Sequence, residues 1–175
     1  MDAAPCIFAP FLGYLWSLSR LFVRAPSGRK RLNVLGALNA ITHEVVTVTN
    51  DASINAQSVC PWLIQLASLH VNLPLTLVLD NARYQKCAVV QERAALLHIE
   101  LLYFPSYSPN LNLIERLWKF VKKQWLYSKY YADYDAFTTA ISDCLQHTHD
   151  RYKKELDSLL TLRFQTFEQV QIINV

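Results

Sequence analysis

The stretch "LTLVLDNARYQ", residues 75–85, decides the class of fold. Its first five residues are apolar or β-branched, as in a short strand that is buried on both faces, and the run stops at Asp80. Ligands in open α/β sheets bind beyond the carboxyl ends of the strands. A carboxylate is costly to bury without a partner, so the position of Asp80 at the end of this strand favours a role in binding a ligand. The competing interpretation is a local cap, because Asp-Asn-Ala-Arg also suits an Asx-turn.

The rest of the chain alternates short apolar strands with helical patterns. Residues 1–31 are expected to be irregular, apart from one strand, because they hold several prolines and a basic turn. The sequence predicts strands over 14–24, 31–39, 44–50, 75–80 and 99–104, the second and third forming a hairpin. It predicts helices over 54–70, 84–98, 111–126, 134–149 and 154–164. This order indicates an α/β layer architecture with a partly parallel sheet.

Composition limits the classes of protein that are possible. The chain has 175 residues, of which 52% are hydrophobic and only three are glycine, which indicates a globular domain with a sizeable core. No apolar run is long enough for a transmembrane helix. The net charge of +3 permits anionic partners without requiring them. The four cysteines form no C-x-x-C pair, which argues against a zinc site or a disulfide framework and suits a reducing cytoplasm.

A second candidate carboxylate, Glu115, lies at the start of the most amphipathic helical segment. The alternative to a catalytic role for Glu115 is a structural one, because Asn112-x-x-Glu115 resembles a capping box in which the glutamate bonds to the backbone. Ser108 followed by Pro109 is a rival cap that would leave Glu115 free. Both interpretations stay open at the level of residue types.

A third acid would complete a metal-dependent site. Phosphoryl transfer with two divalent ions needs several carboxylates that converge within a few Å, and Mg²⁺ prefers oxygen ligands. Asp2 and Asp51 compete for this position. Capping explains Asp51 well, because it precedes a helix, whereas Asp2 is close to the first residue, where side chains are normally solvated.

Two motifs together resemble a known family. The segments "VLDNARYQ" (78–85) and "YFPSYSPNLNLIERLWKFVKK" (103–123) look very much like the catalytic core of bacterial insertion-sequence transposases related to the mariner superfamily. Between Asp80 and Glu115 lie 34 residues, the spacing between the second and third acids of such DDE enzymes. The resemblance continues through residues 27–39, 53–59 and 156–167.

The resemblance implies an RNase H-like α/β fold with a mixed central sheet flanked by helices. It implies a catalytic domain over residues 1–167 followed by a tail over 168–175. It assigns Asp2, Asp80 and Glu115 as catalytic residues and as ligands of two Mg²⁺ ions, with Mn²⁺ as a substitute. The implied activity is metal-dependent DNA strand cleavage and strand transfer of an insertion sequence.

The implied partners are DNA, as transposon ends and target, and a second copy of the chain in a homodimer, with no membrane. The implied location is the bacterial cytoplasm, in association with the nucleoid. Trp118 and Trp125 lie on the apolar stripe of their helix and are expected in the core. The lysines and arginines expected to contact phosphates are Lys119, Lys122, Lys123, Arg29, Lys30 and Arg31; for the last three a solvated basic turn is an equal alternative.

The chain departs from the family pattern at its start. "MDAA" (1–4) resembles the motif of the first strand, so the resemblance selects Asp2 over Asp51, but Pro5 stands where relatives commonly carry histidine. Only Met1 precedes Asp2, and the family's helix-turn-helix DNA-binding region is absent, so we expect a shortened domain with poor catalysis. A non-catalytic remnant that binds DNA or full-length transposase without cutting is the alternative function. A nuclease for RNA–DNA hybrids is disfavoured, because the matched motifs are those of transposases.

Overall fold

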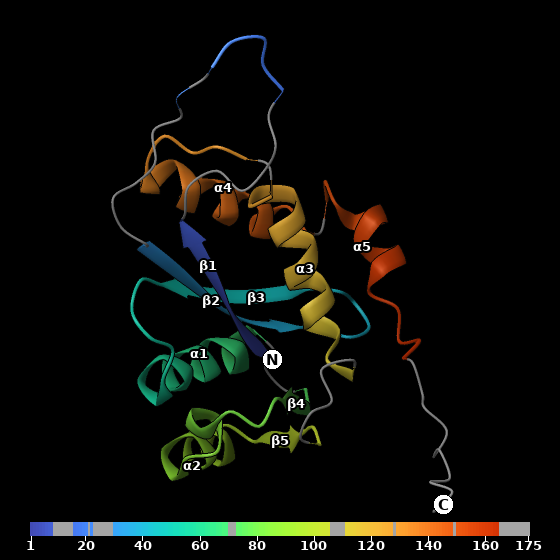
Figure 1. Ribbon diagram of the computed structural model, residues 1–175. Helices are drawn as coiled ribbons and strands as arrows, with labels where there is room; N and C mark the ends of the chain where they lie inside the picture. The colour runs from blue at the N-terminus through green and yellow to red at the C-terminus, as the bar shows by residue number, and fades with distance from the viewer. Residues whose placement is uncertain are drawn as a thin grey trace, which may run out of the picture.

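The computed structural model describes residues 1–8, 16–20, 22, 30–69, 73–105, 111–127, 129–148 and 150–164. Figure 1 shows the arrangement of its elements. In chain order these are β1 (Asp2–Phe8), β2 (Lys30–Leu38), β3 (Val45–Asn50), α1 (Ala56–Leu69), β4 (Leu75–Leu79), η1 (Arg83–Gln85), α2 (Ala88–Leu96), β5 (Ile99–Tyr103), α3 (Leu113–Trp125), α4 (Tyr134–Gln146) and α5 (Lys153–Leu159).

The first strand confirms what the resemblance implied for "MDAA" and corrects the residue pattern, which left these residues irregular. Residues 2–8 form β1, which pairs antiparallel with β2 along its whole length, from Asp2 opposite Gly36 to Phe8 opposite Lys30. Pro5 does not break it, because β1 lies at the edge of this sheet, where a missing N–H removes no ladder hydrogen bond. Alternate side chains of β1 are buried, so the strand is held by packing as well as by pairing.

The predicted hairpin is confirmed as β2 and β3, and the predicted strands at 75–80 and 99–104 are confirmed as β4 and β5. The two pairs form separate sheets: β1-β2-β3 is antiparallel, and β4-β5 is parallel. Their strands are connected by one hydrogen bond, from the Met1 amino group to the carbonyl oxygen of Val78, at 2.6 Å.

Helices cover both faces of the first sheet, as Figure 1 shows, with α3 and α4 on one side and α1 on the other. β2 is therefore buried on both faces: Val34 packs with α3 and α4, while Leu35 packs with α1 and with the β4-β5 sheet. Trp118 is buried in the first of these cores, and Trp125 packs against its edge, so the prediction that both tryptophans are core residues is confirmed.

The remaining elements differ from prediction mainly at their ends. The single helix expected over 84–98 is divided into the short turn η1 and α2. The strand expected over 14–24 is wrong for residues 16–20 and 22, which form no strand, and its other residues lie outside the described part of the chain, as does the tail over 168–175. Among the described residues, no helix is long and apolar enough to cross a membrane.

Gly36 allows α3 to pack closely against the sheet. A Cβ atom at this position would lie 2.8 Å from the Trp118 ring, closer than real Cβ contacts. We predict that Gly36→Ala lowers the free energy of unfolding by about 1–3 kcal/mol, because overpacking outweighs the gain of about 0.4–1 kcal/mol from a less flexible unfolded chain. Urea denaturation measures this change.

The matched control is the same substitution in a Trp118→Leu background. There the contacts with the ring are removed and Thr47 Cγ2, at 3.3 Å, is the remaining close neighbour, so Gly36→Ala should cost clearly less than in the native background, and the two substitutions should be non-additive. An equal penalty in both backgrounds would show that the Trp118 ring does not limit this position.

Candidate active site

The pairing of β1 with β2 places Asp2 on the face of the first sheet that α3 covers. Residues that lie opposite each other in an antiparallel pair point to the same face, so Asp2 shares a face with Gly36. Gly36 is covered by the ring of Trp118. Glu115 precedes Trp118 by three residues on α3, a spacing that places both on one side of the helix. Asp2 and Glu115 therefore approach each other across the interface between sheet and helix.

Asp80 reaches the same place from the second sheet. It directly follows β4, whose residues Leu77 and Leu79 are buried. The hydrogen bond from Met1 to Val78 brings the start of β1 beside the end of β4. Asp2 directly follows Met1, and Asp80 lies two residues after Val78.

The negative charges of Asp80 and Glu115 both act on Asp2. The pKa of Asp2 is raised from 3.8 to about 6, first by burial and in addition by these two charges. The backbone N–H of Ala3, which donates to Asp2 Oδ1 at 2.7 Å, and the Met1 amino group act in the opposite direction. A cation placed between these carboxylates would relieve both the repulsion and the burial cost.

The capping interpretations of Asp80 and Glu115 are wrong. The turn η1 begins after Ala82, and Asp80 Oδ1 is buried with no hydrogen-bond partner within the described part of the chain. Asn112 precedes α3, but its side chain makes no capping hydrogen bond. The Glu115 carboxylate has neither a hydrogen bond nor an ion pair to the described residues. Both carboxylates therefore have free oxygens for an external ligand.

Asp51, the competing third acid, lies elsewhere. Its Oδ1 lies 2.7 Å from the Tyr134 hydroxyl, whose single proton is shared between Asp51 and the carbonyl oxygen of Arg31. Asp51 therefore connects α4 to the first sheet through a hydrogen bond. Its charge is not among those that shift the pKa of Asp2.

The donor chemistry fits a hard divalent cation. All three side chains offer carboxylate oxygens, the ligands that Mg²⁺ and Mn²⁺ prefer, and the unpartnered oxygen of Asp80 is buried. Among the described residues, no three histidine, cysteine, aspartate or glutamate side chains gather closely enough to hold a metal as they stand. An ion bound here would have to draw the carboxylates together.

Two residues beside Asp80, Asn81 and Tyr84, were not predicted as candidate site residues. The Asn81 side-chain amide donates to the carbonyl oxygen of Phe104, so it ties the residue after Asp80 to the end of β5. Tyr84 borders the carboxylates, since burial and the charge of Asp80 raise its pKa to about 12. The quoted stretch at 75–85 contains both residues, but their roles depend on contacts with distant segments.

The predicted phosphate-binding residues of α3 share that helix with Glu115. Lys119 and Lys123 are exposed, and Lys122 is half-buried near Cys6. The first two are therefore free to meet an anion that approaches the carboxylates along α3.

The basic residues of the N-terminal turn lie far from the carboxylates. Lys30 pairs with Phe8 at the opposite end of β1 from Asp2, about 20 Å away at the rise of a strand. Its ammonium group lies over the Tyr134 ring, and Arg31 is exposed beside it. Arg29 lies outside the described residues. Lys30 and Arg31 can therefore contact only nucleic acid that extends well beyond the carboxylates.

The raised pKa of Asp2 predicts a pH-dependent stability. Since the folded state binds this proton more tightly than the unfolded state, the free energy of unfolding falls as pH rises from about 4 to about 6. Asp2→Asn removes the buried carboxylate and with it this loss of stability. In metal-free buffer the variant should therefore have a higher Tm than the native protein at pH 7.5, and the difference should disappear at pH 4.

Glu92→Gln, an exposed substitution on α2, is the control, and its effect on Tm should be the same at both pH values. Scanning calorimetry at several pH values gives the comparison. A constant difference between Asp2→Asn and the native protein across this range would contradict the burial and repulsion described above.

Comparisons with known proteins identify the family and the fold of the chain. A sequence model of the family described as DDE superfamily endonuclease matches residues 19–138, which include Asp80 and Glu115 but not Asp2. An uncharacterized protein, y4pE/y4sA of Sinorhizobium fredii, is 38% identical over 42 residues, which cover 24% of this chain and 31% of that protein.

Solved structures of Mos1 transposase are similar in fold. The Mos1 strand transfer complex gives a TM-score of 0.66 at 15% identity, over 91% of this chain and 50% of that chain. The Mos1 catalytic domain with raltegravir and Mg gives 0.55 at 15% identity, over 79% and 78%. The chain thus spans about half the length of the Mos1 chain in the strand transfer complex.

The match to the family over more than half of the chain agrees with the RNase H-like arrangement of two sheets and flanking helices. The protein belongs to the DDE superfamily of endonucleases.

Proposed function

We propose that this domain is the catalytic domain of a DDE transposase that cuts and joins DNA strands of an insertion sequence. The observation that carries the proposal is the electrostatic coupling of Asp2, Asp80 and Glu115, which come from two strands and a helix. The charges of Asp80 and Glu115 both raise the pKa of Asp2, which supports a site built on three acids rather than on structural ion pairs. The proposed location is the nucleoid, where the substrate lies.

In this proposal the three carboxylates hold two divalent cations, Mg²⁺ or Mn²⁺. When bound, such ions supply Lewis acidity to a phosphodiester and make a coordinated water more acidic. Asp80 would offer its unpartnered oxygen, and Asn81 would keep Asp80 oriented through its bond to Phe104. Glu115, which makes no capping hydrogen bond, would offer carboxylate oxygens from α3.

DNA is the proposed substrate, and α3 would contact its backbone. Lys119 and Lys123 follow Glu115 along the exposed side of the helix, where ammonium groups can pair with phosphates. Such contacts fix position without reading sequence. Transposon ends, target DNA and a second copy of the chain are the proposed partners.

A second candidate function is a non-catalytic relative that binds DNA or a longer transposase without cutting. Two observations favour it. The family match begins after Asp2, and the described residues include no group of three side chains that is already close enough to hold a metal.

A nicking assay on supercoiled plasmid with Mg²⁺ or Mn²⁺ separates the two functions. We expect slow but measurable nicking by the native chain, in keeping with the poor catalysis expected from its sequence, and a further loss of at least about 10²-fold in Asp80→Asn or Glu115→Gln, since catalytic geometry tolerates displacements of only about 1 Å. Metal removal with EDTA should abolish nicking in every variant.

The control is Asp51→Asn, which changes an acid outside the site. It should keep native activity and native Mn²⁺-induced stabilisation, both of which Asp80→Asn should lose. Absence of metal-dependent nicking in a folded native chain, with DNA binding retained, would instead support the second candidate.

The contribution of α3 to DNA binding is tested separately. The double variant Lys119→Gln/Lys123→Gln should bind DNA more weakly, and the slope of log affinity against log salt should fall by about 2, since each phosphate contact contributes about 0.9. The loss should be equal for transposon-end and random duplexes. Lys154→Gln, an exposed substitution on α5, should leave affinity and slope unchanged.

A further inference from the structure

Arg116, in the first turn of α3, bonds to backbone carbonyl groups at the end of α5. Its Nη1 atom donates to the carbonyl oxygen of Thr161 at 2.7 Å, and its Nη2 atom donates to that of Arg163 at 3.1 Å. Nη1 also lies 3.4 Å from the carbonyl oxygen of Leu159, the last residue of α5. One side chain therefore connects α3 to residues 159–164, which we call the exit segment of α5.

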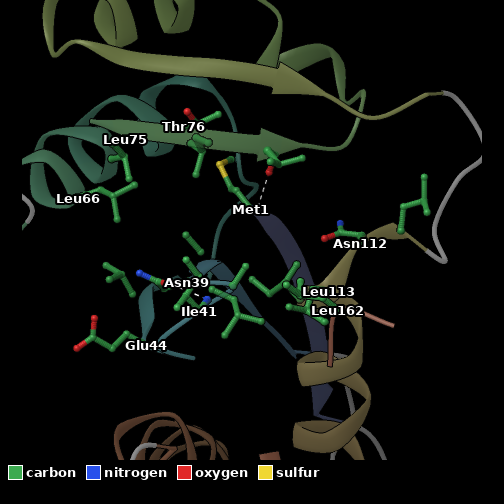
Figure 2. Close-up of a pocket in the computed structure, with 18 of the residues that line it drawn as sticks. Met1, Asn39, Ile41, Glu44, Leu66, Leu75, Thr76, Asn112, Leu113 and Leu162 are labelled. Atoms are coloured by element: carbon green, nitrogen blue, oxygen red, sulfur yellow. Dashed lines mark hydrogen bonds between the residues drawn. The ribbon is translucent and has the colours of Figure 1, made fainter. Parts of the chain in front are cut away.

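The exit segment packs against the start of α3. Leu160 is buried in the same core as the inner side of α3, and the centroid of the Phe164 ring lies 5.4 Å from the guanidinium carbon of Arg116. Figure 2 shows Leu162 of this segment and Leu113 of α3 on the same side of a largely apolar cavity of about 600 Å³. The bonds of Arg116 thus belong to a packed contact between the two segments.

Arg116 and Glu115 lie on opposite flanks of the buried side of α3. Successive residues of an α-helix are rotated by about 100°, so Glu115 borders the buried side next to Trp118, and Arg116 borders it next to Phe120. The contact of Trp118 with Gly36 holds the first flank, and the bonds of Arg116 hold the second. A helix that is held on both flanks resists rotation about its axis.

The contribution of Arg116 is one of position rather than of charge. Within the described chain it forms no ion pair with a carboxylate, and its charge is not among those that shift the pKa of Asp2. The planar guanidinium group presents its donors in a fixed fork, whereas the ammonium group of a lysine is a point charge on a flexible stem. The shape of the side chain therefore matters at this position, and not only its charge.

We propose that Arg116 is a positioning residue for Glu115, which fixes the rotation of α3 and thereby holds the Glu115 carboxylate at the metal site. The inference rests on the proposed function, in which Glu115 is a metal ligand. Without the bonds to the exit segment, α3 keeps its buried side against the sheet but gains freedom to rotate. A displacement of the carboxylate by about 1 Å is enough to impair catalysis about 10²-fold.

The test compares Arg116→Gln and Arg116→Lys with the native chain. In buffer without DNA, electron paramagnetic resonance of Mn²⁺ gives the dissociation constant, which should rise about 10-fold or more in both variants, as for other residues that orient a metal ligand. In the plasmid nicking assay at saturating Mn²⁺, kcat should fall about 10–100-fold, whereas KM for DNA should stay unchanged. A role in stability alone would lower Tm without changing Mn²⁺ affinity in the folded protein.

The matched control is Asp157→Ala, which loosens α5 at another point. Asp157 Oδ1 lies 2.8 Å from Nδ1 of His43 in the turn between β2 and β3, and its loss leaves the bonds of Arg116 in place. This variant should keep native Mn²⁺ affinity and native kcat, even if its Tm falls. All proteins are compared at a temperature at which circular dichroism shows them folded, and Arg116→Lys carries the test if Arg116→Gln does not fold.

The outcomes separate this inference from the proposed function. Native Mn²⁺ affinity in both Arg116 variants, or an equal loss in Asp157→Ala, would overturn the role of Arg116 while leaving the proposed function in place. Recovery of affinity in Arg116→Lys would show that charge rather than geometry is required, and would also overturn it. A native chain that neither binds Mn²⁺ nor nicks DNA would overturn both.

Discussion

The contact between Gly36 and the ring of Trp118 determines how closely α3 packs against the first sheet. A side chain at position 36 would push the helix away, and with it Glu115, which lies one turn before Trp118. Gly36 is also the pairing partner of Asp2. The interface between α3 and β2 therefore determines the distance between helix and sheet, and Asp2 lies on the face of the sheet that carries Glu115. The candidate site depends on this packing more than on any local motif.

The second sheet is attached to the first far less firmly. Strands β1 to β3 share two complete antiparallel ladders, whereas β4 is connected to β1 by the hydrogen bond from Met1 to Val78. Apolar packing of Leu35, Leu77 and Trp62 in a common core completes the connection. The position of Asp80 relative to Asp2 therefore follows from a core and one backbone bond, at the border of a cavity.

The carboxylates are an electrostatic cost to the fold. Burial and like charge raise the pKa of Asp2 to about 6, so near neutral pH the protein keeps a charge that its surroundings disfavour. The charge of the Met1 amino group offsets part of this cost, whereas the exposed lysines of α3 lie further along the helix. In the proposed function this cost is offset by a bound cation.

The sequence by itself determined most elements and two of the acids. The apolar runs predicted β4 and β5, and the amphipathic stripe predicted α3. The motifs around Asp80 and Glu115 indicated both residues and the fold. All of these signals are local in the sequence. The residue pattern alone could not determine β1, which the resemblance placed at "MDAA", because the strand is stabilised by pairing with β2 and by packing. Only the tertiary structure showed that Asp51 lies beside Tyr134, that Glu115 makes no capping hydrogen bond, and that Lys30 lies at the far end of the sheet. Each of these depends on register and packing between segments far apart in the chain, for which no short stretch of residues carries a signal.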